Sequence, residues 1–151
     1  MKPCTDTAIK AKFGDPTEYI TDAGGIDPAW EKLILTSIVL PAPLKLSFCD
    51  GVAKSMKCHK QMAPIFVRVF DELYSAGLWK KIKWFGGCYC WRVQRTSNKK
   101  LSRHSWGIAV DLFCGGDATP SAIVDIFKRN GFIWGGDWKT PDYMHFELGK
   151  V

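Results

Sequence analysis

The apolar positions in the middle of the chain predict an amphipathic helix. From about Val52 to Ala76 the pattern turns helical, and apolar residues recur at spacings of three and four at Met62, Phe66, Val69, Phe70 and Leu73. This spacing is typical of one buried helix face. Because proline fits only the first turn of a helix, Pro64 places the start of the regular part near residues 59–63. Gly77 is typical of the position just beyond a helix end.

Shorter patterns predict a second helix and several strands. Thr119-Pro120 is typical of a helix start, with Thr119 as the N-cap, and Gly131 of a helix end. An apolar segment over 30–40, interpreted as a short strand or an extended clamp, is expected to stop at Pro41 and Pro43. The other strand-like segments are 83–92, 106–113, 132–134 and 144–148, and the polar segment 94–100 is expected to be a loop.

These elements together predict an α+β fold, with a small, mainly antiparallel sheet and helices packed to one side. A chain of 151 residues fits one domain, which would span residues 1–151. The polar, glycine-containing residues 1–25 are expected to form a loose N-terminal arm.

Composition narrows the class of protein. The net charge of +6 favours anionic partners. The basic residues form no continuous stripe, which argues against a dedicated nucleic-acid binder. No apolar run approaches the ~20 residues of a membrane span, and the first residues lack the apolar core of a secretory signal, so we expect no membrane insertion and synthesis in the cytoplasm. The six cysteines are then expected to be free thiols.

Two of the three histidines lie near carboxylates in unusual settings. Asp111 is an acid within an apolar strand, where burying an unpaired carboxylate costs several kcal/mol. Gly107 allows the chain to turn, so that His104 can bend back toward Asp111, and a metal ion would satisfy both side chains. The remaining histidine, His59, is expected to be structural or exposed.

Asp142 and His145 form the second setting. Their offset of three would put them on opposite faces of a regular strand, but a turn at Pro141 lets both side chains converge. His104, Asp111 and His145 then form a three-ligand zinc set that leaves a fourth position for water. Asp142, a carboxylate outside this set, fits a proton shuttle.

The string Ser102-x-His104-x-x-Gly107-x-Ala109-x-Asp111, followed by Asp142-x-x-His145, resembles the M15 family of zinc peptidases. That family includes D-alanyl-D-alanine carboxypeptidases and dipeptidases, and phage endolysins of the L-alanyl-D-glutamate peptidase type. The stretch Gly131 to Trp138 is similar to the G-F-x-W-G-G-D-W sequence of the phage branch. The resemblance extends from about residue 30 to residue 148 and implies a fold like that of these peptidases and the hedgehog signalling domain.

The resemblance implies a role for each matched residue. His104, Asp111 and His145 match the zinc ligands, and Asp142 matches the general base. An arginine before the S-x-H string binds the substrate carboxylate or steadies the oxyanion. Arg92 or Arg95 would have this role, and Arg92 is the preferred candidate.

Three further residues are open to two interpretations. Ser102 either orients the site or contacts substrate, or is a simple turn hydroxyl. Trp138 either lines the cleft or packs in the core. Glu147 is expected on the same strand face as His145, where it could support that ligand, or else at the surface.

The function implied is that of a monomeric zinc peptidase that cuts a peptide bond in the stem peptides of bacterial peptidoglycan. The phage-like features imply an endolysin with L-alanyl-D-glutamate endopeptidase activity, kept in the host cytoplasm until lysis. One alternative is a D-alanyl-D-alanine carboxypeptidase or dipeptidase. Another is a non-catalytic, zinc-stabilised binding module, against which the presence of Asp142 argues.

Overall fold

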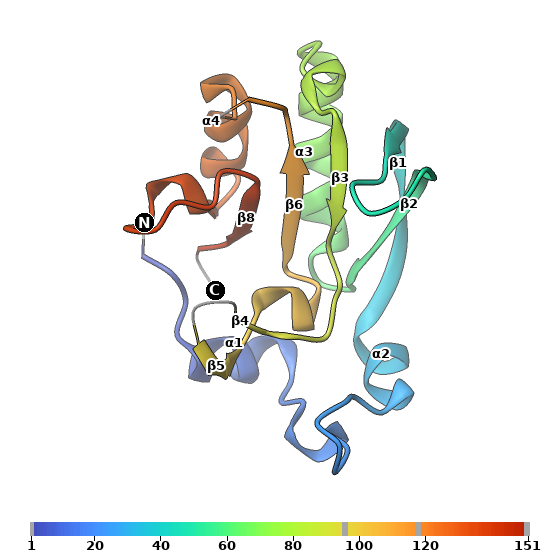
Figure 1. Cartoon of the computed structure of the whole chain (residues 1–151), viewed down its shortest axis with the longest axis vertical. Coiled ribbons are helices and arrows are strands. Elements are labelled where there is room, and N and C mark those ends of the chain that lie inside the picture. The colour runs from blue at the N-terminus through green and yellow to red at the C-terminus, as the bar shows by residue number, and fades with distance from the viewer. Residues whose placement is uncertain (1, 95–96, 117–118, 150–151) are drawn as a thin grey trace.

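A four-stranded antiparallel sheet forms the centre of the computed structural model, which describes residues 2–94, 97–116 and 119–149 (Figure 1). Its strand order is β3-β6-β8-β7. The strands are β3 (Trp84–Gly87), β6 (Ala109–Phe113), β8 (His145–Leu148) and β7 (Phe132–Trp134). All neighbouring pairs are antiparallel, which confirms the predicted α+β class.

The two longer helices, α3 (Ala63–Ser75) and α4 (Ser121–Arg129), cover one face of this sheet. Phe66 of α3 contacts Phe132 of β7, with ring centroids 5.4 Å apart. Phe127 of α4 stacks on Phe146 of β8 at 3.9 Å. Most of the hydrophobic core therefore lies between the helices and one sheet face, and the predicted placement of the helices is confirmed.

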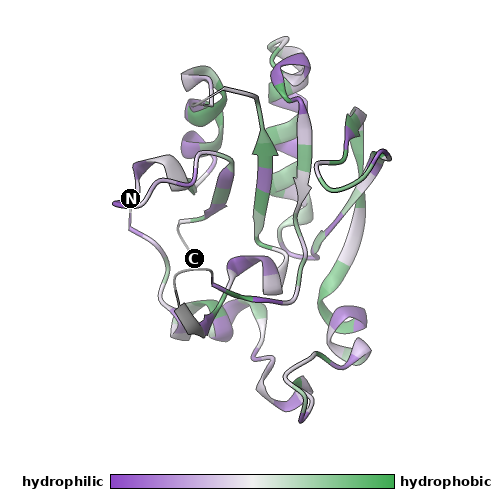
Figure 2. Cartoon of the chain, viewed as in Figure 1, coloured by the Kyte–Doolittle hydropathy of each residue, from purple (hydrophilic) through white to green (hydrophobic). Residues whose placement is uncertain are grey.

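Side-chain alternation along β6 and β8 separates the core from the opposite sheet face. Val110 and Leu112 of β6, and Phe146 and Leu148 of β8, belong to the core. Asp111 and His145 alternate with them and therefore project from the other face. Figure 2 shows β6 as mainly hydrophobic with a hydrophilic interruption, so one short strand serves both the core and a polar site.

A long hairpin packs beside the sheet. It consists of β1 (Leu35–Lys45), which follows α2 (Pro28–Ile34), and of β2 (Val52–His59). The prediction that Pro41 and Pro43 stop the strand is wrong: β1 continues to Lys45, and the prolines lie where the register with β2 shifts. The helical pattern expected from Val52 is also wrong for residues 52–59, which form β2, whereas α3 starts at Ala63, within the range predicted for the regular part.

The N-terminal region differs from the loose arm expected for residues 1–25. Helix α1 (Asp6–Phe13) is capped by Thr5, whose hydroxyl accepts a hydrogen bond from the Ala8 backbone nitrogen, and a short helix η1 (Thr17–Tyr19) follows. Ile9 and Phe13 are buried. The prediction is wrong here because two large apolar side chains in so short a segment are too few for a periodic signal, yet tertiary burial stabilises the helix.

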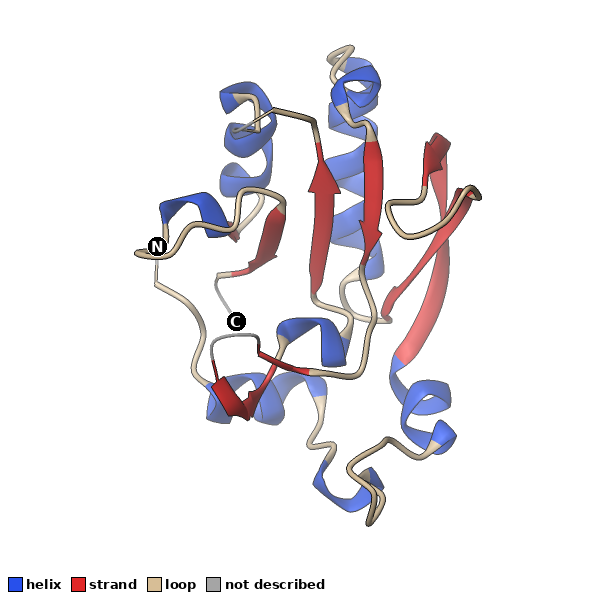
Figure 3. Ribbon diagram, in the orientation of Figure 1, coloured by secondary structure: helices blue, strands red, loops and turns tan. Residues whose placement is uncertain are grey.

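The remaining elements are short: η2 (Trp79–Lys81), β4 (Val93–Gln94), β5 (Ser97–Leu101), η3 (Arg103–Trp106) and η4 (Gly135–Asp137) (Figure 3). The predicted loop over 94–100 contains most of β5, which pairs with β4. Helix α4 begins at Ser121, and the Thr119 hydroxyl donates to the Tyr143 carbonyl instead of capping the helix. All six cysteines are free thiols, as predicted. No helix in the described ranges is long and apolar enough to cross a membrane.

Gly107 is expected to be one of the most sensitive positions for stability. Its φ of +67° lies in the left-handed region, and an added Cβ would lie 2.8 Å from the backbone nitrogen of His59. Gly77 has a similar φ of +70° but nothing within 4 Å of an added Cβ. We expect Gly77→Ala to lower the free energy of unfolding by about 1 kcal/mol, and Gly107→Ala by more than ~2 kcal/mol, because only the second adds a backbone clash to the conformational strain. Equal losses in denaturant titrations would contradict the close approach.

Candidate metal centre

The short helix η3 positions His104. The Ser102 hydroxyl accepts a hydrogen bond from the His104 backbone nitrogen at 3.4 Å and so caps the helix. Gly107 ends the helix in a left-handed conformation, after which the chain enters β6. The His104 ring is fixed by its Nδ1, 2.6 Å from the Cys88 carbonyl oxygen. This local structure turns the imidazole back toward the sheet.

Strands β6 and β8 position the other two residues. Asp111 and His145 are paired across the two strands, so their side chains lie directly opposite each other on one sheet face. Gly86 of β3 leaves room for this arrangement, because a Cβ there would lie 2.8 Å from the Asp111 Cβ. All three residues, His104 included, are buried.

Three donor atoms meet at this point. His104 Nε2 lies 3.2 Å from Asp111 Oδ1 and 3.2 Å from His145 Nδ1, and His145 Nδ1 lies 3.0 Å from Asp111 Oδ1. A tetrahedral zinc ion with ligand bonds of ~2.0–2.1 Å separates its ligand atoms by about 3.3 Å. The observed triangle therefore has nearly the size that one zinc ion requires. Within the described part of the chain, this is the one group of three such side chains close enough to share an ion.

The outer contacts of the two histidines indicate which ring nitrogens carry hydrogen. The Cys88 carbonyl can only accept, so His104 Nδ1 donates to it. The Glu147 carboxylate likewise accepts from His145 Nε2 at 2.9 Å. In the neutral rings, His104 Nε2 and His145 Nδ1 therefore both present lone pairs to Asp111. A proton can satisfy one contact of this triangle, whereas a divalent cation satisfies all three, so the residues fit a zinc ion.

The surroundings of the site shift the pKa of both Asp111 and His145. Burial would raise the pKa of Asp111, but hydrogen bonds from His104 and His145 in their protonated form, and the positive charges of those rings, outweigh it and hold the pKa well below its usual range. Burial would lower the pKa of His145, but its contacts with Asp111 and Glu147 raise it to about 9. Both shifts mean that the surroundings of these two groups favour a carboxylate beside a cation.

Glu147 and Arg103 support His145 from behind. Glu147 lies two residues after His145 on the same strand face and is buried, as the supporting-role interpretation requires. Arg103 Nε lies 4.0 Å from Glu147 Oε1. A carboxylate behind a ligating imidazole fixes the tautomer and orientation of the ring and raises its basicity.

A cavity of about 1030 Å³ opens beside this centre. His145 and Glu147 line it, and so does Asp142. The turn before β8 places Asp142: its backbone nitrogen donates to the Gly135 carbonyl at 2.9 Å, and its own carbonyl accepts from the His145 nitrogen at 3.2 Å. A Cβ at Gly135 would collide with the Asp142 carbonyl. Asp142 therefore faces a space large enough for a peptide, next to His145.

The structure places the other candidates as follows. Arg92 lines the cavity, and its guanidinium lies 3.5 Å from Asp111 Oδ2. Trp138 also lines the cavity, with its ring centroid 5.1 Å from that of His145. Ser102 is buried at the cavity edge and acts as the helix cap described above. Arg95 lies outside the described residues.

Sequence reasoning missed two features of this site. The first is Arg103, which lies inside the S-x-H string and is only 5% exposed. The second is the segment Lys2–Asp6, which lines the cavity although it lies about a hundred positions away in the chain. Arg103 was missed because a single buried arginine within a motif gives no periodic signal. Lys2–Asp6 was missed because a polar segment at the start of a chain resembles a loose arm.

Part of the chain is similar in sequence to known peptidases. Residues 95–148 match the M15 peptidase family model described as D-alanyl-D-alanine carboxypeptidase. The chain is also 33% identical over 87 residues to the peptidoglycan L-alanyl-D-glutamate endopeptidase CwlK of Bacillus subtilis (strain 168). That alignment covers 52% of this chain and 52% of the relative, so the chain spans about half the length of the curated relative it matches.

Proposed function

We propose that this chain, whose residues 95–148 match the M15 peptidase family model, is a zinc-dependent peptidase acting on the stem peptides of bacterial peptidoglycan. One observation carries the proposal. Two imidazole nitrogens and a carboxylate oxygen converge at 3.0–3.2 Å beside a cavity that a further carboxylate, Asp142, also lines. A site that only stabilised the fold with zinc would need neither the cavity nor Asp142.

The residues divide the chemistry among them. Zinc held by His104, Asp111 and His145 would polarise the scissile carbonyl and lower the pKa of water to about 7. Asp142 takes the proton from the attacking water and delivers it to the leaving amine. Arg92 places a positive charge at the cavity wall, where it can bind a substrate carboxylate or the developing oxyanion.

The scissile bond we propose is the one between L-alanine and D-glutamate, because the aligned Bacillus protein carries that activity in its name. The description of the matching family favours a second candidate, the terminal D-alanyl-D-alanine bond. The phage-like sequence features support an endolysin role, in which the protein stays in the host cytoplasm until lysis and then reaches the wall.

Digestion of muropeptides that contain both bonds distinguishes these activities. We expect mass spectrometry to find fragments with a new D-glutamate amino terminus, in zinc-loaded protein and not in zinc-depleted protein. Release of free D-alanine alone would assign the carboxypeptidase activity instead. Intact muropeptides with fully loaded protein would overturn the proposed function.

A further inference from the structure

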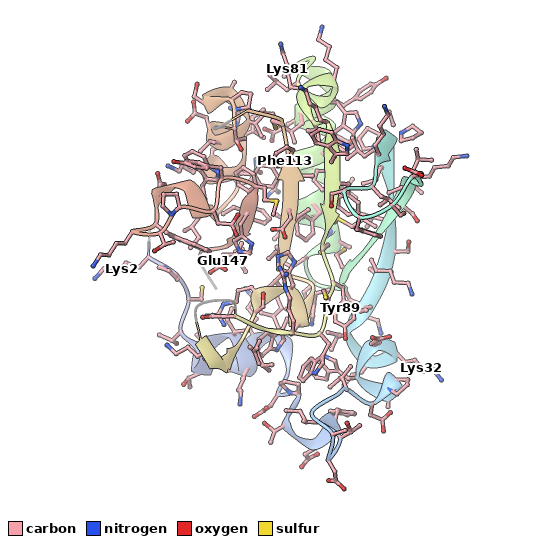
Figure 4. All side chains as sticks on the ribbon, viewed as in Figure 1. Lys2, Lys32, Lys81, Tyr89, Phe113 and Glu147 are labelled. Carbon is pink, nitrogen blue, oxygen red and sulfur yellow. The ribbon has the colours of Figure 1, made fainter. Side chains whose placement is uncertain are left out.

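The segment Lys2–Asp6 forms one wall of the cavity beside the metal centre. All five of its residues line the same space as Asp142 and His145. In Figure 4, Lys2 and Glu147 lie toward the same side of the molecule, whereas Lys32 lies at the other side. The segment would therefore contact any peptide that reaches the metal centre through this cavity.

Arg103 holds this segment in place. Its guanidinium donates to the Cys4 carbonyl oxygen at 2.6 Å and to Asp6 Oδ1 at 2.7 Å. The same side chain lies 4.0 Å from Glu147, the partner of the ligand His145. A buried guanidinium is stable only with anionic or carbonyl partners, so the segment and the support of the metal centre share one buried cation.

Helix α1 gives the segment a firm base. Ile9 is fully buried, and the Trp106 indole nitrogen donates to the carbonyl of Gly14, the residue that caps α1, at 2.8 Å. Trp106 belongs to η3, the helix that carries both His104 and Arg103. The segment and helix α1 are thus attached to η3, the element that positions a candidate zinc ligand, through Cys4, Asp6 and Gly14.

The charges of the cavity wall indicate what the segment would bind. Asp6 and Glu147, two of the acids lining the cavity, lie beside Arg103. Lys2 and Lys100 also line it, and neither forms an ion pair within the ranges that the structure describes. This part of the cavity offers cations to a ligand, and a carboxylate-bearing peptide complements them.

We propose that Lys2–Asp6, docked by Arg103, is part of the substrate site, and that Lys2 interacts with a carboxylate of the bound peptide. This inference rests on the proposed peptidase function for its ligand, an acidic stem peptide. In it, Arg103 is a positioning residue and Lys2 determines specificity.

Labelling of the native thiol of Cys4 tests the docking without any substrate. We expect Asp6→Ala to increase the rate of Cys4 alkylation several-fold, measured by mass spectrometry, because one of the two contacts with Arg103 is lost. The exposed Cys49 is the internal reference. Asp15→Ala, which removes an exposed acid that pairs with Lys10 outside the cavity, is the matched variant and should leave Cys4 unchanged. An unchanged rate in Asp6→Ala would overturn the docking.

Calorimetric binding of a stem peptide to the zinc-loaded Asp142→Ala chain tests the role of Lys2. In that background we expect Lys2→Glu to raise the Kd about five- to tenfold, since it replaces an attraction by a repulsion at an exposed site of the cavity wall. Lys32→Glu makes the same change in net charge away from the cavity and should leave the Kd within about twofold. Equal effects of the two substitutions would overturn the role of Lys2.

The two proposals fail in different ways. A wild-type chain that binds the peptide with the Lys2 dependence but never cleaves it would overturn the peptidase function and leave this inference standing. Cleavage by the wild-type chain, with no effect of Lys2→Glu on the Kd, would overturn the role of Lys2 and leave the peptidase function standing. A stem peptide that binds neither the wild-type chain nor the Asp142→Ala chain would overturn both proposals.

Discussion

Asp142→Ala is expected to abolish hydrolysis of peptidoglycan while the protein keeps its zinc. Asp142 lines the cavity beside His145 but does not belong to the triangle of His104, Asp111 and His145. Loss of a general base lowers the rate by roughly 10²–10⁴-fold. We therefore expect kcat to fall by that factor, with zinc content, measured by atomic emission, close to that of the wild type.

Asp137→Ala is the matched control for this experiment. Asp137 is five residues away, exposed, and paired with Lys128 at 2.6 Å, and it does not line the cavity. We expect its activity to stay within about twofold of the wild type, because an exposed ion pair contributes ~1 kcal/mol or less. Full activity of Asp142→Ala would rule out the mechanism, and loss of zinc from it would make Asp142 a ligand.

His104→Gln is expected to remove zinc and activity together. Its Nε2 is one of three converging donors, so the variant leaves a two-ligand site. Loss of a partner behind a zinc ligand weakens binding ~10–100-fold, and loss of the ligand itself should exceed that. We expect dialysed protein to contain little zinc, and the increase in Tm on adding zinc to disappear, because that increase requires binding to the folded state.

His59→Gln is the matched control, since it changes the same residue type outside the metal centre. His59 is also buried, but its Nε2 lies 3.1 Å from the Phe13 carbonyl and its Nδ1 accepts from the Gln61 backbone. The variant should lose stability and keep zinc at the wild-type stoichiometry. If instead His59→Gln lost zinc and His104→Gln kept it, the assignment of the metal centre would be wrong.

Several parts of the fold were predictable from local sequence. The spacing of Phe66, Val69, Phe70 and Leu73 predicted α3 because these side chains share one helix face. The segments 132–134 and 144–148, which were predicted to be strands, correspond to β7 (Phe132–Trp134) and β8 (His145–Leu148). In each case the local pattern agrees with the burial that the fold imposes.

Other parts were not predictable, because distant contacts decide them. Pro41 and Pro43 normally end a strand, but the register shift between β1 and β2 accommodates them. Residues 6–13 carry only two large apolar side chains, yet they form α1 because both of these, Ile9 and Phe13, are buried. Neither outcome depends on the neighbouring residues alone.

For the metal centre, the sequence and the tertiary structure each determine a different part. The sequence by itself determined the donor types: two histidines and an aspartate in a family-like string, with Asp142 three residues before the second histidine. Asp111 could be recognised from the sequence because a carboxylate in an apolar strand needs a cation. The pairing of β6 with β8 decided that Asp111 and His145 face each other, and η3 decided that His104 completes the triangle.

Only the tertiary structure decided what surrounds that triangle. Arg103 connects the start of the chain to Glu147, and Lys2–Asp6 becomes a wall of the cavity. The physical reason is that the buried guanidinium of Arg103 is stable only beside anionic or carbonyl groups, so it contacts those that the fold brings next to it. Those partners lie about a hundred residues away along the chain, so no local pattern records them.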